Sequence, residues 1–336
     1  MTEALSLGVD LGGTKVEAVL LRRTPAGPGF EILTRERVAT GSERGYEAIL
    51  TTTAELVRNV ARSSGRPLLE LAVGVGMPGS VSRTTGLVKN SNTVCLNGRP
   101  FREDLSRALG CPVAFENDAN CFALAEAYLG AGRAHRKGIV FGVILGSGVG
   151  GGIVIDGRVW PGPQNLAGEW GHHAVGPWAR VEMLAGAAPS AAGFAACGLS
   201  PRARCYCGKM GCLELYASGV NVEREYERRT GRRRILKELV ASRIDDVDAA
   251  SVVDEMIEAI GRGLANVIDI LDPSAIVLGG GVSNLDILYG EGVARVARYL
   301  FNDELRTPIL KHELGDSAGV LGAALLHTDE YTHASE

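Results

Sequence analysis

The chain has 336 residues, of which 46% are hydrophobic and 22% charged, as is usual for a globular protein. This length predicts two lobes rather than one core. With 35 basic and 39 acidic residues the net charge is −4, so no basic excess indicates binding to nucleic acid or to an anionic membrane. A signal peptide is not recognisable, and no apolar run reaches the roughly 18–20 residues of a membrane-spanning helix, so we expect a cytoplasmic protein.

The first feature along the chain is a predicted β-hairpin with a glycine-rich tip. Residues 5–9 form a short apolar strand, the chain returns as a strand over 15–22, and the tip reads DLGGTK. Paired glycines let backbone N–H groups face an anion such as phosphate, and a hydroxyl and a positive charge would add to its binding. A carboxylate at the end of the strand could hold a water molecule bound to Mg²⁺. The candidate ligands are Asp10, Gly12, Gly13, Thr14 and Lys15. A plain Gly-Gly hairpin turn would give the same pattern.

Strands and helices then alternate, which indicates an α/β protein. The predicted elements are a helix over 46–61, strands over 71–75 and 111–115, and a helix over 122–129. Between the last two lies NDAN at 117–120. A carboxylate at the end of a strand lies where α/β folds bind ligands, so Asp118 is a candidate to take a proton from a substrate hydroxyl, with Asn117 bonding a neighbouring hydroxyl. A helix cap would fit the same position.

A second glycine-rich turn repeats the pattern of the first. GSGVGGG at 146–152 follows a predicted strand over 138–145 and precedes a return strand that ends at Ile155. Its backbone and one hydroxyl could bind a second phosphate, although a structural turn remains the alternative. The candidate residues are Gly146, Ser147 and Gly148. Two such units predict two similar lobes that face one cleft.

Three of the seven cysteines are clustered at 205–212 with the spacing C-x-C-x₄-C. Without a secretion signal, this cluster predicts a zinc site rather than disulfides. The cysteines are Cys205, Cys207 and Cys212, and the fourth ligand is either His172 or His173. Nearby polar residues that suit the hydroxyl groups of a sugar are Glu169, His172 and Glu214, each of which would also fit an ordinary surface position.

The last third of the chain supplies a long helix and a further glycine turn. An amphipathic helix is predicted over 253–271, and a buried strand over 275–278 leads into three glycines. Gly280 and Gly281 are candidates to pass close to an adenosine, although a tight strand-to-helix turn would look the same. A closing helix is predicted over 319–326.

Together these motifs resemble the ROK family of bacterial sugar kinases and repressors, from DLGGTK at 10–15 to GDSAGVLGAA at 315–324. The resemblance implies an actin-like ATPase (ribonuclease H-like) fold, with ATP, Mg²⁺ and sugar in a cleft, structural zinc, and a homodimer. It implies that Asp118 is the catalytic base. The implied sugar ligands are Gly79, Asn117, Asp118, Glu169, His172 and Glu214, and the implied zinc ligands are His172, Cys205, Cys207 and Cys212.

The resemblance implies two lobes. The N-terminal lobe comprises residues 1–117, and the C-terminal helix at about 316–336 packs back on it. The C-terminal lobe comprises residues 118–315 and contains the zinc-binding loop at 168–214. The segment at 82–105 looks most like the fructokinase or mannokinase branch, which predicts transfer to the 6-hydroxyl of fructose. N-acetylglucosamine kinase and glucokinase are the alternatives, and Cys95 stands where fructokinase-like members carry Trp. A sugar-sensing repressor is the distant alternative, because the motif at Asp10 leaves no room for a preceding DNA-binding domain and the net charge is acidic.

Overall fold

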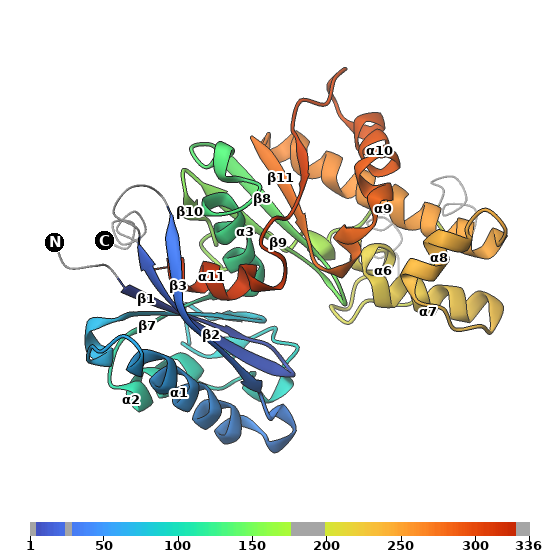
Figure 1. The fold of residues 1–336 in the computed structure, drawn as a ribbon. Helices are drawn as coiled ribbons and strands as arrows, with labels where there is room; N and C mark the ends of the chain where they lie inside the picture. Colours follow the sequence, from blue (N-terminus) through green and yellow to red (C-terminus); the bar gives the residue numbers. More distant parts are fainter. Residues whose placement is uncertain (1–4, 24–28, 176–198, 327–336) are drawn as a thin grey trace. The chain divides into compact units, whose positions relative to one another are not determined.

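The computed structural model describes residues 5–23, 29–175 and 199–326 (Figure 1). Packing divides the chain into two units. The first unit comprises residues 1–142, 152–167 and 313–336, and the second comprises 143–151 and 168–312. The predicted boundary at 117/118 differs from this division, because the helix that starts at Asp118 packs with the first unit.

A five-stranded sheet of order β3-β2-β1-β4-β7 forms the centre of the first unit. Its strands are β1 (Leu5–Leu11), β2 (Lys15–Arg23), β3 (Phe30–Ala39), β4 (Ala72–Met77) and β7 (Val113–Asn117). β1, β2 and β3 pair antiparallel, whereas β4 pairs parallel with both β1 and β7. The carboxyl ends of β1, β4 and β7 therefore meet at one edge, where Asp10 and Asn117 lie.

Helices cover both faces of this sheet (Figure 1). On one face, α1 (Tyr46–Arg62) and α2 (Phe101–Leu109) close the hydrophobic core. On the other face lie α3 (Asp118–Tyr128) and α11 (Ala318–Leu325). A side chain on Gly8 of β1 would collide with the Val320 carbonyl of α11, so α11 packs directly on the first sheet. Residues 327–336 of the predicted helix lie outside the described residues.

The second sheet has the order β10-β9-β8-β11-β12. Its strands are β8 (Ile139–Leu145), β9 (Val149–Ile155), β10 (Arg158–Val159), β11 (Ala275–Gly279) and β12 (Ile309–Lys311). A small hairpin joins β5 (Ser80–Val81) to β6 (Val88–Lys89). Single 3₁₀ turns occur at Ser42–Arg44, Leu68–Glu70, Val94–Leu96, Arg133–His135, Trp170–His172, Gly281–Asn284, Asp286–Tyr289 and Gly315–Ser317.

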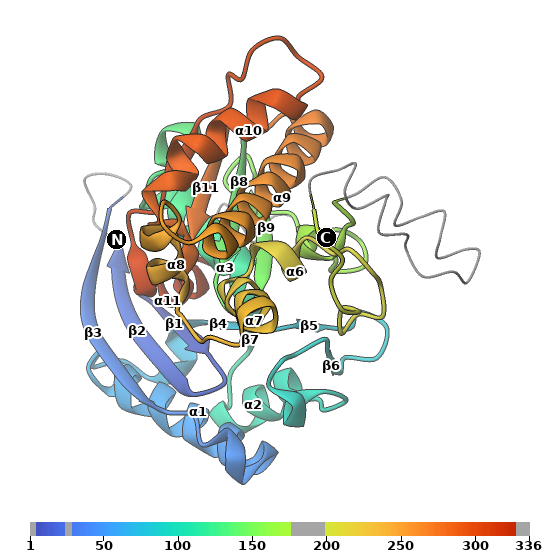
Figure 2. The same cartoon turned by 90° about the vertical axis from the view of Figure 1, so that its right-hand side faces the viewer.

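The long helix α9 (Val247–Leu271) organises the second unit (Figure 2). The helices packed against it are α6 (Glu214–Ala217), α7 (Gly219–Thr230), α8 (Leu236–Ser242) and α10 (Glu291–Tyr299). α9 begins before the predicted Val253, because the Asp246 carboxylate caps it by accepting from two backbone N–H groups. Its buried acids are paired: Glu255 with Arg202 and Arg229, and Glu258 with Arg262 and Arg295. Among the described helices none is long and apolar enough to cross a membrane.

Candidate active site

The first glycine turn is held rigidly by its own unit. The Gly12 N–H donates to the Lys15 carbonyl at 3.0 Å, which closes the β1–β2 hairpin. The carbonyl oxygens of Gly12 and Gly13 accept from the hydroxyls of Thr40 and Ser42, at 2.8 and 2.7 Å. Gly12 therefore shapes the turn instead of offering its N–H to a phosphate. In the part of the chain that the structure describes, the N–H groups of Gly13 and Thr14 have no protein acceptor.

Asp10 is a buried carboxylate at the end of β1. Burial, together with the charge of Glu17, raises the pKa of Asp10 to about 6, against the opposing pull of Lys15 and Arg37. A Cβ at Gly319 would lie 3.0 Å from the Asp10 carboxylate, so this glycine lets the start of α11 approach the acid. A carboxylate kept in a poorly solvated place with a raised pKa suits the binding of a cation.

The turn from β7 into α3 confirms the helix-cap interpretation of Asn117. The Asn117 Oδ1 accepts from the Ala119 N–H at 2.9 Å, and its Nδ2 donates to the Gly79 carbonyl at 3.0 Å. These bonds bring together two of the predicted sugar ligands. Asp118 is the first residue of α3, and its Oδ1 also accepts from the Ala119 N–H at 2.9 Å. The cap and the catalytic hypothesis are compatible, because capping fixes the direction in which the next side chain leaves the helix.

Sequence reasoning missed Glu116, which precedes this pair. Its Oε1 accepts from the Asn117 N–H at 2.8 Å and from Asn120 Nδ2 at 2.9 Å. Burial raises the pKa of Glu116, and hydrogen bonds from Asn117 and Asn120 oppose the rise. The only signal in the sequence was an acid next to NDAN at the end of a strand.

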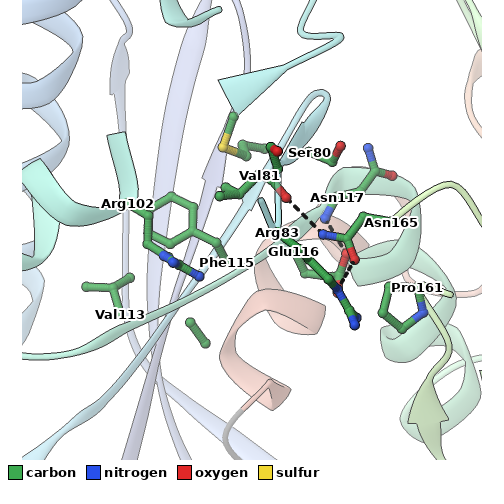
Figure 3. Close-up of a pocket in the computed structure, with 13 residues that line it drawn as sticks. Ser80, Val81, Arg83, Arg102, Val113, Phe115, Glu116, Asn117, Pro161 and Asn165 are labelled. Carbon is green, nitrogen blue, oxygen red and sulfur yellow. Dashed lines mark hydrogen bonds between the residues drawn. The ribbon is translucent and has the colours of Figure 1, made fainter. Parts of the chain in front are cut away.

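A cavity of about 590 Å³ opens beside this corner within the first unit (Figure 3). Strand β7, the segment at 80–83 and two residues after β10 line it. The Asn165 Nδ2 donates to the Val81 carbonyl at 2.9 Å, and Arg83 Nε donates to Asn165 Oδ1 at 3.0 Å. Figure 3 shows Arg83, Glu116, Asn117 and Asn165 around the same space. None of the sequence motifs pointed to Asn165, because its partners are more than 80 residues away.

The second glycine turn borders a cavity of about 520 Å³ in the second unit. The Gly146 N–H donates to the Gly148 carbonyl, and the Gly219 N–H donates to the Gly146 carbonyl, both at 2.9 Å. Gly281 lies in the cavity wall, whereas Gly280 does not. Gly280 has a φ of 81°, and a side chain there would collide with Leu145, so its role is in packing. The cavity is lined by Gly146, Ser147, Gly219, Val220, Glu223, Ile235, Leu236, Lys237, Gly281, Val282, Asn284 and Leu285.

The helices α7 and α8 supply the part of this wall that the sequence did not predict. The Glu223 Oε1 accepts from the Leu236 N–H at 2.8 Å, which joins the start of α8 to α7. Lys237 adds a positive charge, while Val220 and Ile235 add apolar surface. A mixed wall of apolar side chains with a few polar groups is typical of small-molecule pockets.

The cysteine cluster converges with one histidine. The ligand atoms of His172, Cys205, Cys207 and Cys212 lie within 4.8 Å of one another. The Cys207 and Cys212 sulfurs are 3.5 Å apart, and the Cys205 sulfur lies 3.7 Å from His172 Nδ1. The neighbouring His173 instead packs edge-on against Trp170, so the geometry favours His172. Three thiols and one imidazole at these separations fit a tetrahedral structural zinc site.

Glu214 connects this cluster to the second glycine turn. Its Oε2 accepts from the Val149 N–H at 3.0 Å, and a Cβ on Gly148 would lie 2.9 Å from the same oxygen. Glu169 and His172 belong to one turn, in which the His172 N–H donates to the Glu169 carbonyl at 3.2 Å, and a β-bridge joins Ala174 to Cys212, two residues before Glu214.

Comparison with known proteins gives a consistent result along almost the whole chain. The ROK family matches residues 6–330. An N-acetyl-D-glucosamine kinase of Vibrio atlanticus is 36% identical over 321 residues, which cover 95% of this chain and 98% of that protein. The chain therefore belongs to the ROK family, as its motifs predict.

Solved structures confirm the actin-like fold. A ROK hexokinase from Thermus thermophilus superposes with a TM-score of 0.76 at 31% identity, covering 96% of this chain and 97% of that one. A ROK glucokinase from Streptomyces griseus, solved with glucose and AMPPNP, has a TM-score of 0.70 at 29% identity and covers 96% and 99%. The relatives named here are sugar kinases.

Proposed function

We propose that the protein is a kinase that transfers the γ-phosphoryl group of ATP to the 6-hydroxyl of N-acetyl-D-glucosamine. For this sugar, the supporting observation is the 36% identity to an N-acetyl-D-glucosamine kinase over 95% of the chain. Fructose, our first expectation from the segment at 82–105, receives less support than this alternative. Glucose is a second candidate, because the Streptomyces griseus neighbour is a glucokinase.

On the acceptor side, Asp118 takes the proton of the sugar hydroxyl as the hydroxyl oxygen attacks the γ-phosphorus and ADP leaves. Asn117 holds this corner through its bonds to the Ala119 N–H and the Gly79 carbonyl. The Ala119 N–H donates to Asp118 Oδ1 at 2.9 Å, which fixes this carboxylate at the start of α3. Phosphoryl transfer depends mainly on positioning and on charge neutralisation, and this short, capped turn supplies the positioning.

On the donor side, the nucleoside occupies the cavity between α7, α8 and Gly281, whose apolar and polar wall suits a nucleobase with its ribose. In the first unit, the N–H groups of Gly13 and Thr14 and the charge of Lys15 suit phosphate oxygens. In the second unit, the turn at 146–148 suits them. Asp10 holds Mg²⁺ or its water. Bound Mg²⁺ would neutralise the charge on the β- and γ-phosphate oxygens.

Zinc has a structural role in this proposal. His172, Cys205, Cys207 and Cys212 would fill all four positions, which leaves none for a reacting water. The metal would fix the segment that leads to Glu214. His172, Glu169 and Glu214 then present hydrogen-bonding groups to the sugar from this ordered segment.

The test is an ADP-release assay with N-acetylglucosamine, fructose, mannose and glucose. We expect the highest kcat/KM for N-acetylglucosamine, at least tenfold above fructose. A higher value for fructose would overturn the sugar assignment and leave the kinase intact. ADP release that does not depend on any of the four sugars would contradict sugar-kinase activity itself.

A further inference from the structure

Glu223 on α7 uses only one of its two carboxylate oxygens within the protein. Its Oε1 accepts from the Leu236 N–H at 2.8 Å, and this bond holds the side chain at the junction of α7 and α8. In the part of the chain that the structure describes, Oε2 has no hydrogen-bond or ion-pair partner. Glu223 is half-buried and lines the cavity of about 520 Å³ in the second unit, so a fixed carboxylate with a free acceptor stands in the cavity wall.

A carboxylate is an unexpected wall group in a cavity proposed to hold a nucleotide. An ionised carboxylate only accepts hydrogen bonds, and phosphate oxygens are acceptors as well, so Glu223 does not suit the phosphates. The donors that a nucleotide offers are the hydroxyl groups of its ribose and the 6-amino group of adenine. The position of Glu223 along α7 decides between them.

That position favours the ribose. Gly219 begins α7, and its N–H donates at 2.9 Å to the carbonyl of Gly146, in the turn proposed to bind phosphate. Glu223 follows four residues later, so it lies on the same face of the helix, one turn or about 5.4 Å along the axis. In a nucleotide the ribose is joined directly to the phosphates, and the base lies beyond it. A group one helical turn from the phosphate turn therefore meets the ribose before the base.

We propose that Glu223 is a specificity-determining residue that accepts hydrogen bonds from the ribose hydroxyls of the bound nucleotide. The inference rests on the proposed function for the presence of a nucleotide in this cavity, but not on the identity of the sugar. Because the Leu236 N–H already fixes the carboxylate, little side-chain entropy is lost when the ribose binds. A site built to bond a hydroxyl rejects an analogue that lacks it, since its own polar group is then left unpaired.

The test is calorimetric titration of the full-length protein with Mg²⁺ and ADP, 2′,3′-dideoxyADP or inosine diphosphate, in the absence of sugar. We expect the wild type to bind ADP about tenfold or more tightly than the dideoxy analogue, as a hydrogen bond to a charged group allows. Glu223→Gln keeps an oxygen for the Leu236 N–H but replaces the charged acceptor with a neutral amide. It should weaken ADP binding about fivefold and leave binding of the dideoxy analogue unchanged.

The matched control is Glu227→Gln, which changes another acid on α7. The Glu227 carboxylate lies one turn further along the helix and outside the cavity wall, where it pairs with Arg233 at 2.6 Å. This variant should bind all three nucleotides as the wild type does.

Two results would overturn the inference. One is a wild type that binds 2′,3′-dideoxyADP as tightly as ADP. The other is a Glu223→Gln variant that keeps the wild-type preference for ADP over the dideoxy analogue; if this variant instead changes the preference for ADP over inosine diphosphate, the carboxylate lies at the base.

The readout separates this inference from the proposed function. Nucleotide binding is measured without sugar and without turnover, so a wrong sugar assignment would leave the expected affinities unchanged. A wild type that binds none of the three nucleotides would contradict the nucleotide site of the proposed function, and the role of Glu223 with it.

Discussion

Glu214 Oε2 accepts a hydrogen bond from the Val149 backbone N–H at 3.0 Å, which links the residue two beyond Cys212 to the glycine turn at 146–148. Glu214 is 8% exposed and Val149 is 5% exposed, so the bond lies away from bulk water. A single carboxylate thus connects the segment proposed to bind the sugar with the turn proposed to bind a phosphate.

This relationship predicts different effects for two substitutions of Glu214. Glu214→Gln keeps an oxygen for the Val149 N–H, whereas Glu214→Ala leaves that buried donor without a partner, at a cost of ~1–3 kcal/mol. We expect the alanine variant to raise KM for ATP several-fold and to lower Tm. The glutamine variant should keep both near wild type while it weakens sugar binding. Equal KM values for ATP in the two variants would contradict the link.

Asp118 is predicted to be the catalytic base. Asp118→Asn should lower kcat by about 10²- to 10⁴-fold, because the amide cannot take the proton, while the Kd for the sugar changes little. Calorimetric titration with the sugar and steady-state kinetics measure the two quantities. The matched control is Asp248→Asn, another acid in the first turn of a helix, which should leave both unchanged. Near-normal turnover of Asp118→Asn would remove the base assignment.

Asp10 makes stability and magnesium binding respond oppositely to pH. Its pKa is raised from 3.8 to about 6, so between these values the folded chain holds more protons than the unfolded one. The free energy of unfolding therefore falls as pH rises through this window, by ~3 kcal/mol for a shift of this size. Mg²⁺ binding should instead weaken below about pH 6, where the carboxylate is protonated.

Asp10→Asn separates these effects. Without Mg²⁺, the variant should be more stable than the wild type at pH 8 and equally stable near pH 4, as measured by urea unfolding. It should also lose the Mg²⁺ dependence of ATP binding. A variant less stable than the wild type at pH 8 would contradict this account, because it would show that interactions in the native state outweigh the cost of burying the ionised Asp10 carboxylate.

Metal removal should destabilise the second unit. We expect about one zinc per chain by elemental analysis in the wild type and almost none in Cys212→Ser. Binding of structural zinc contributes directly to folding, so the variant and a chelator-treated wild type should both lose Tm. Cys95→Ser, at a half-buried cysteine outside the cluster, is the control and should retain the metal. Full zinc content in Cys212→Ser would exclude the proposed site.

The sequence predicted what local patterns encode: the α/β class, both glycine turns, and the cysteines with a histidine close by. It did not resolve which histidine joins the cluster, because His172 and His173 are adjacent and only the backbone conformation decides which ring faces the cysteines. The sequence pattern indicated that the Gly12 N–H donates a hydrogen bond to a phosphate, but in the structure this N–H closes the hairpin. The part of the cavity wall formed by Glu223 and Lys237 depends on the packing of α7 beside α8, and no short sequence motif predicts that packing.

Incubation of the protein with Mg²⁺-ATP and an equimolar mixture of N-acetylglucosamine, fructose, mannose and glucose, followed by NMR analysis of the products, tests the central claim most directly. The account predicts that N-acetylglucosamine 6-phosphate is the main phosphorylated sugar and that it forms in a one-to-one ratio with ADP. Fructose phosphate as the main product, or ADP accompanied only by free phosphate, would contradict it.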